Sequence, residues 1–125
     1  WAPELTALIT DGDTASVLRP LYALPVEHRW ERAPGVTLIG DAAHLSLPNG
    51  EGANLAMYDA AELAEALAAH PDDPETALTT YEQAMFPRST AAATDGTHIH
   101  EALYGTDAPH SLISMFTDHE PPTQA

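Results

Sequence analysis

The chain has 125 residues, the usual size of one domain, which permits a hydrophobic core but excludes a large two-lobed enzyme. Its 19 Asp and Glu residues against four Arg and no Lys give a net charge of −15, which argues against nucleic acid and anionic membranes as partners. The absence of Cys excludes disulfides, thiolate nucleophiles and Cys-based zinc sites, and it agrees with the cytoplasmic location that we expect.

The N-terminal third predicts a short helix and an edge strand. A helix begins at Pro3, with Leu5, Leu8 and Ile9 on one face. Residues 17–26 alternate as in a β-strand, but their two prolines cannot donate to a ladder, so we expect an edge strand. A polar connection then ends in a Pro-Gly turn.

The central third predicts a strand, a loop and a helix. Residues 36–39 are a β-branched run between glycines, which is typical of a buried strand. Residues 40–52 form a glycine-rich loop. A helix follows from Ala53, with apolar residues at steps of three and four, and it ends at His70.

The C-terminal third predicts a second helix, with Asp73 as its cap. Pro87 should kink or end that helix, and helical composition resumes over 91–103. A break at 105–109 precedes a short apolar turn at 112–116 and a mobile tail. The fold class is therefore α+β and mainly helical. The apolar stripe of the second helix predicts core packing by Leu78, Tyr81, Met85 and Phe86.

The loop between the buried strand and the central helix carries the chemical signal. Its glycines allow the backbone to approach a ligand closely, and the positive end of the helix favours an electron-rich group. Asp41, directly after the strand, is placed to accept hydrogen bonds from hydroxyls. With no Lys in the chain and two acids in this loop, a phosphate site is disfavoured. We expect a cofactor with a polyol segment and an acceptor-rich ring edge.

The order Gly-Asp-Ala-Ala-His, Pro, Gly-x-Gly-x-Asn and Asp-Ala over residues 40–60 resembles the second FAD fingerprint of class A flavoprotein monooxygenases. The tetracycline-modifying monooxygenases and the para-hydroxybenzoate hydroxylase group are similar to it, and the Tyr-Glu pair at 81–82 also matches the family. Between His44 and Gly50 the loop is one residue shorter than the family spacing.

The resemblance implies FAD as cofactor, NAD(P)H as reductant and hydroxylation of a small organic substrate, aromatic or polyketide-like, with oxygen. It implies that Asp41 holds a ribityl hydroxyl, that Pro48 lies beside the isoalloxazine ring, and that the start of the central helix faces the pyrimidine edge. The cofactor-binding residues that it implies are Gly40, Asp41, Pro48, Gly50, Gly52, Ala53 and Asn54.

The resemblance also implies the C-terminal portion of a two-domain FAD-binding monooxygenase fold. Residues 1–35 would end the substrate-domain segment, 36–70 would contact FAD, 71–117 would form the C-terminal helices, and 118–125 the tail. No Gly-x-Gly-x-x-Gly follows a strand, so we expect the ADP-binding half in a missing N-terminal portion. We expect the isolated chain to be inactive and to self-associate through exposed apolar faces.

Three weaker signals have simpler interpretations. His44 more often packs or caps a loop than acts as a catalytic base, and Asp59 is expected to be structural. His98 and His100 lie two apart on a helix and point to different sides, so no metal site is predicted. Two other classes stay open: a different flavin oxidoreductase of the same superfamily, and a non-catalytic helical interaction module.

Overall fold

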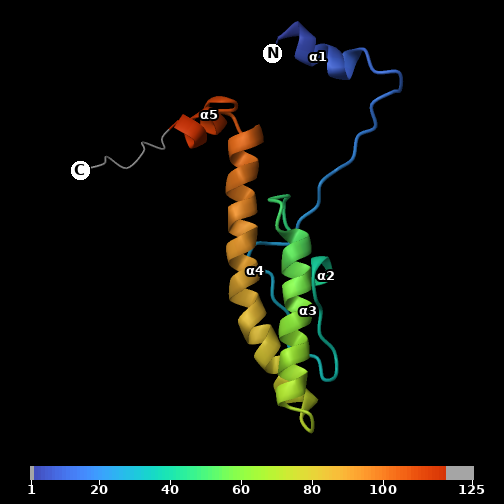
Figure 1. Cartoon of the computed structure of the whole chain (residues 1–125), viewed down its shortest axis with the longest axis vertical. Helices are drawn as coiled ribbons and strands as arrows, with labels where there is room; N and C mark the ends of the chain where they lie inside the picture. Colours follow the sequence, from blue (N-terminus) through green and yellow to red (C-terminus); the bar gives the residue numbers. More distant parts are fainter. Residues whose placement is uncertain (1, 118–125) are drawn as a thin grey trace, which may run out of the picture.

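The structure, a computed structural model, describes residues 2–117 and is built around two long antiparallel helices (Figure 1). α3 and α4 lie side by side, α2 lies against α3, and α5 folds over the end of α4. α1 stands apart at the end of an extended segment. The helices are α1 (Pro3–Thr10), α2 (Asp41–His44), α3 (Gly52–Ala69), α4 (Pro74–Tyr104) and α5 (His110–Thr117).

The start of α4 confirms the predicted cap. The Asp73 carboxylate accepts hydrogen bonds from the Thr76 amide at 3.1 Å and the Thr76 hydroxyl at 2.7 Å. These two bonds lower the pKa of Asp73. Pro74 occupies the first turn, where its missing N–H costs no helical hydrogen bond.

The core lies between the first half of α4 and α3, as the apolar stripe predicted. Tyr81 and Met85 are at most 1% exposed, and Leu78 is buried as well. Phe86 is partly buried and packs edge-on against Trp30, with 4.9 Å between ring centroids. The stripe is therefore confirmed as core.

Residues 27–39 are fastened to α4 by polar contacts. Buried Glu82 accepts hydrogen bonds from the Trp30 indole at 3.2 Å and from the Thr37 hydroxyl at 2.8 Å. Arg32 forms an ion pair with Glu75 at 2.7 Å. The Pro34–Gly35 turn forms as predicted, with Gly35 at a φ of 71°. These contacts fix the position of the segment that leads into α2.

Both predicted strands are wrong for the described residues, since 2–117 contain helices, turns and extended segments but no strand. The helical part of the predicted fold class is thus confirmed and its β part is not. Residues 17–26 are extended, with Leu18 93% exposed, and the prolines remove ladder donors. Residues 36–39 are also extended, but Val36 and Ile39 are exposed rather than buried, because no neighbouring strand of the described chain pairs with them.

Of the two outcomes predicted at Pro87, α4 shows the bend and not the end: it runs through Pro87, and its yellow first part leans away from its orange remainder in Figure 1. Two other segments differ from prediction. The loop at 40–52 contains the short helix α2, and the apolar turn at 112–116 is part of α5. The tail at 118–125, predicted to be mobile, lies outside the described residues.

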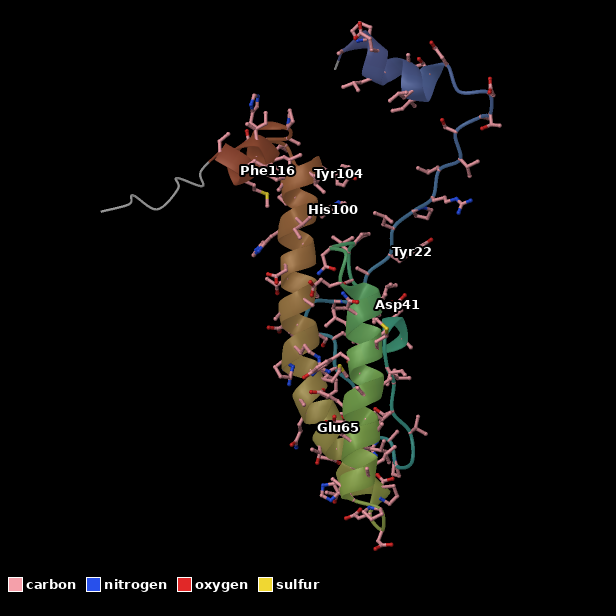
Figure 2. The ribbon with its side chains drawn as sticks, in the orientation of Figure 1. Tyr22, Asp41, Glu65, His100, Tyr104 and Phe116 are labelled. Carbon is pink, nitrogen blue, oxygen red and sulfur yellow. The ribbon has the colours of Figure 1, made fainter. Side chains whose placement is uncertain are left out.

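Many apolar side chains at the two ends of the described chain are exposed. In α1, Leu8 and Ile9 are more than 70% exposed, and in α5 Phe116 is 78% exposed (Figure 2). Of the helices in 2–117, none combines the length and apolarity needed to cross a membrane.

The core predicts a sharp contrast between two methionines. Met85→Ala removes a fully buried side chain between α3 and α4 and should lower the free energy of unfolding by about 2–5 kcal/mol. Met115→Ala, on the half-exposed face of α5, is the matched control and should change it by less than about 1 kcal/mol. Urea unfolding followed by circular dichroism measures both. Equal losses in the two variants would show that the α3–α4 contact is not the core.

Candidate functional site

A buried carboxylate joins the glycine-rich loop to both long helices. Asp59 on α3 is fully buried and accepts three hydrogen bonds. The donors are the Gly40 amide at 2.9 Å, the His44 Nε2 at 2.6 Å and the Arg88 Nη2 at 2.9 Å. We refer to these four residues as the Asp59 cluster. The contacts of this cluster agree with the structural roles predicted for Asp59 and His44.

Arg88 balances the charge of this cluster from α4. Its Nη1 also donates to Glu62 at 2.6 Å, and its guanidinium lies 4.6 Å from the ring centre of Tyr58. Burial raises the pKa of Asp59, but the bonds from Gly40, His44 and Arg88 outweigh burial and lower it overall. Burial likewise lowers the pKa of Arg88, but its two carboxylate partners raise it overall. The pair is therefore ionised.

Tyr81 closes the cluster on the side of the extended segment. Its hydroxyl donates to the Leu38 carbonyl at 3.1 Å. Burial, together with the nearby negative charge of Asp59, raises the pKa of Tyr81 well above its ordinary value. The hydroxyl thus stays protonated and acts as a fixed donor to residues 36–39.

Gly40 turns the chain from this extended segment into α2. It has a φ of 59°, and a Cβ at this position would lie 3.0 Å from the Cβ of Ala56. Both the backbone angle and the close approach to α3 require glycine here. Its carbonyl accepts from the amides of Ala43 and His44, and so begins the turn that places Asp41.

The glycine-rich loop surrounds a cleft of about 310 Å³ between α2 and the start of α3. The structure brings five of the seven predicted cofactor-binding residues to its wall. Gly40 lies behind the wall, where it bonds Asp59, and Asn54 is exposed in the first turn of α3. The predicted residues that line the cleft are Asp41, Pro48, Gly50, Gly52 and Ala53, and the others are His44, Ser46, Leu47 and Asn49.

The electrostatics of the cleft combine one carboxylate with an uncapped helix end. Asp41 is exposed at the wall, as Figure 2 shows beside α2. At the start of α3, Glu51 makes no side-chain cap and the first turn holds no acid, so the amides of this turn have no capping side chain, and Gly52 and Ala53 of the same turn line the cleft. No Arg lines the cleft. These groups suit hydroxyls and a ring edge with acceptors rather than a phosphate.

The sequence did not point to Arg88 as part of this region, nor to the contact between Asn49 of the loop and α4. Arg88 holds the loop through Asp59, and Asn49 bonds the loop to α4. One signal was available for Arg88: it is the single arginine after Arg32 in a strongly acidic chain without Lys, and it comes directly after a proline inside a helix. Within 2–117, His98 and His100 gather no third metal ligand.

Comparison with known proteins adds a family to this geometry. The profile of a family described as "FAD binding domain" matches residues 25–95. The chain is 32% identical over 111 residues to 3-amino-4-hydroxybenzoate 2-monooxygenase of Streptomyces cremeus, covering 87% of this chain and 27% of that protein. It is 36% identical over 91 residues to FAD-dependent urate hydroxylase of Mycolicibacterium vanbaalenii, covering 71% and 23%.

A third relative is kynurenine 3-monooxygenase of Salinispora tropica, 48% identical over 65 residues, which are 51% of this chain and 14% of that protein. The chain therefore spans between 14% and 27% of the length of these three curated relatives. The matched region contains the Asp59 cluster and the whole cleft.

The Asp59 cluster predicts a pH-dependent loss of stability. Asp59→Asn removes the charge that pairs with Arg88 and should lower the free energy of unfolding near pH 7 by on the order of 3 kcal/mol. Because the folded-state pKa of Asp59 lies below its ordinary value of 3.8, this stabilisation is complete above that value and lost as pH falls through the folded pKa. Urea unfolding over a pH series should show the two proteins converging at low pH.

Glu65→Gln, which neutralises an exposed carboxylate on the same helix, is the control and should change the stability little at any pH. A difference between Asp59→Asn and the parent chain that stays constant down to acid pH would contradict the ion-pair account.

Proposed function

The chain belongs to the FAD binding domain family and is related to FAD-dependent monooxygenases and hydroxylases, and from this membership we propose that its cleft holds the flavin end of FAD. The family membership confirms the resemblance drawn from residues 40–60. One observation supports the proposal most: five residues of the fingerprint motif, which lie in α2, the loop and α3, line one cleft.

We assign a part of the cofactor to each group of residues that lines the cleft. The Asp41 carboxylate accepts a hydrogen bond from a hydroxyl of the ribityl chain. The amides at the start of α3, from Gly52 and Ala53, face the acceptor-rich edge of the flavin ring and favour negative charge there. Pro48 and Gly50 lie along the ring. When bound, FAD supplies the transfer of electrons from NAD(P)H to oxygen.

The size and charge of the cleft fit part of FAD rather than all of it. A volume of about 310 Å³ is at the lower end of small-molecule sites. With no Arg in its wall, the cleft offers nothing to balance a diphosphate. We therefore assign the ADP half, the NAD(P)H contacts and most of the substrate pocket to a separate, N-terminal portion.

The exposed apolar groups suit a contact with that portion. Val36, Leu38 and Ile39 are between 38% and 56% exposed beside the cleft-forming loop. An extended, apolar and unpaired segment is suited to joining a sheet. Without this partner we expect the chain to self-associate through the same residues.

The proposed activity of the whole protein is hydroxylation of a small organic substrate, aromatic or polyketide-like. The relatives support a monooxygenase over another flavin oxidoreductase, since those reported above are named as monooxygenases or hydroxylases. Substrate-dependent oxygen consumption with insertion of oxygen into the product would distinguish the two. NAD(P)H oxidation without oxygen insertion would favour the other oxidoreductases.

The flavin assignment predicts a loss of affinity on removing one carboxylate. Asp41→Ala should raise the Kd for FAD, measured by quenching of flavin fluorescence, by about tenfold, the value of one hydrogen bond to a charged group. Asp72→Ala, which removes an exposed carboxylate far from the cleft, is the matched control and should leave the Kd unchanged. Equal affinities in all three proteins would remove Asp41 from the site.

The division of the FAD site predicts that the chain alone does not turn over. With FAD and NAD(P)H added, it should show no NAD(P)H oxidation above that of free FAD, because the ADP-binding and reductant-binding groups are assigned elsewhere. Absorbance at the nicotinamide band measures this rate. Steady turnover by the purified 125-residue chain would contradict the assignment.

A further inference from the structure

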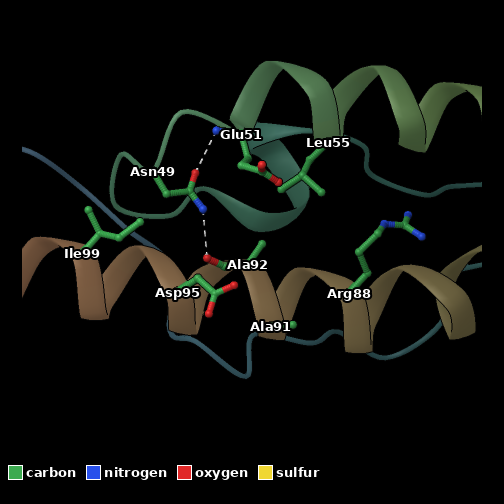
Figure 3. A pocket seen from close by; sticks show the side chains of 8 residues that line it. All are labelled: Asn49, Glu51, Leu55, Arg88, Ala91, Ala92, Asp95 and Ile99. Carbon is green, nitrogen blue, oxygen red and sulfur yellow. Dashed lines mark hydrogen bonds between the residues drawn. The ribbon is translucent and has the colours of Figure 1, made fainter. Parts of the chain in front are cut away.

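The second half of α4 contacts the cleft loop directly. The Asn49 amide donates to the Ala92 carbonyl at 3.2 Å, and its oxygen accepts from the Glu51 amide at 2.9 Å (Figure 3). Ala92 lies inside α4, where its carbonyl already faces the amide of residue 96 in the helical pattern. The Asn49 side chain thus links the loop to α4 and to Glu51, the residue that precedes α3.

Gly96 permits a second contact between α4 and the loop. A Cβ built on Gly96 would lie 2.7 Å from the Leu47 carbonyl oxygen and 3.6 Å from its carbon. Both are backbone atoms, which cannot rotate away as a side chain can. The loop therefore lies directly on the backbone of α4 at this turn.

Glycine at position 96 is unfavourable for helix formation. Gly96 is the single glycine inside α4, and glycine weakens a helix interior relative to Ala. Gly96 is also buried. Close approach of the Leu47 carbonyl gives a reason for the glycine that helix formation does not.

We propose that Gly96 and Asn49 are positioning residues for the flavin cleft. Together they set how far Leu47, Pro48 and Gly50 stand from α4, and hence the width of the cleft that these loop residues line. The role of the two residues in flavin binding rests on the proposed function. The contact between the loop and α4 does not depend on it. Gly96 acts from outside the cleft, whereas Asn49 also lines it.

The test separates this role from a purely helical one, because the two roles predict opposite results for Gly96→Ala. Ala favours the helix, so a helical role alone predicts equal or higher thermal stability and an unchanged loop. A positioning role predicts faster hydrogen–deuterium exchange within residues 47–51, where the Glu51 amide is bonded to the Asn49 side chain, by at least about fivefold, the value of one lost hydrogen bond. Acceleration confined to this segment supports the proposal. Unchanged exchange there, or equal acceleration throughout α3 and α4, would overturn it.

A second variant tests the side-chain contact without altering the helix. Asn49→Asp keeps an acceptor for the Glu51 amide but removes the donor to Ala92, so the same loop amides should exchange faster. Gly12→Ala is the control, since a Cβ there meets only atoms at 3.7 Å and 3.8 Å. It should leave exchange at 47–51 unchanged.

An FAD titration then connects the contact to the cleft. Gly96→Ala and Asn49→Asp should raise the Kd for FAD several-fold, whereas Asp41→Ala should raise it without changing exchange at 47–51. If the parent chain does not bind FAD, the proposed function fails for the isolated chain while the exchange result still decides the contact with α4. Faster loop exchange with an unaltered Kd in a chain that binds FAD would overturn the positioning role.

Discussion

The charge of Asp59 is the constraint on which the arrangement of this chain depends. A carboxylate without solvent must be paired and fully hydrogen-bonded, and its three donors come from the two ends of the α2 turn and from α4. Satisfying it fixes the turn at Gly40, the orientation of His44 and the register of Arg88 against α3. The cleft follows from this geometry, because Asp41 and the loop begin where Gly40 is held.

The acidic chain has few cations, and half of its arginines pair with carboxylates inside the fold. The chain has four Arg, and two of them serve buried or partly buried carboxylates: Arg88 pairs with Asp59, and Arg32 lies 3.6 Å from Glu82. Arg29 lies over the ring of Phe86 at 5.4 Å. Little positive charge is left for ligands, which is why the cleft can offer amides and a carboxylate but nothing suited to a diphosphate.

How far the sequence predicted the structure depended on whether a feature was local. The stripe that contains Tyr81 and Met85 follows from helical periodicity, and the cap at Asp73 follows from residue type, so both were predictable. The gathering of Asp41 and Gly52 at one cleft was readable from the order of the motif. The strand predicted at 36–39 is wrong, because a strand exists only with a ladder partner and residues 2–117 supply none. The role of Arg88 and the bond from Asn49 to α4 were missed because the partners lie 29 and 43 residues away in the chain.

The cleft loop is held by contacts on two sides, whereas the neighbouring segment 36–39 exposes apolar side chains. On one side the loop is fixed by the Asp59 cluster and on the other by the backbone of α4 at Gly96. Residues 36–39 have the opposite character, being held to the helices through Tyr81 and Thr37 while their apolar side chains face outward. A backbone that is already ordered loses less conformational entropy on binding, so this exposed edge supports the proposal that a second portion pairs with it. The cleft that we propose for the flavin begins at Asp41, just after this edge and Gly40, and the proposed partner would therefore meet both features together.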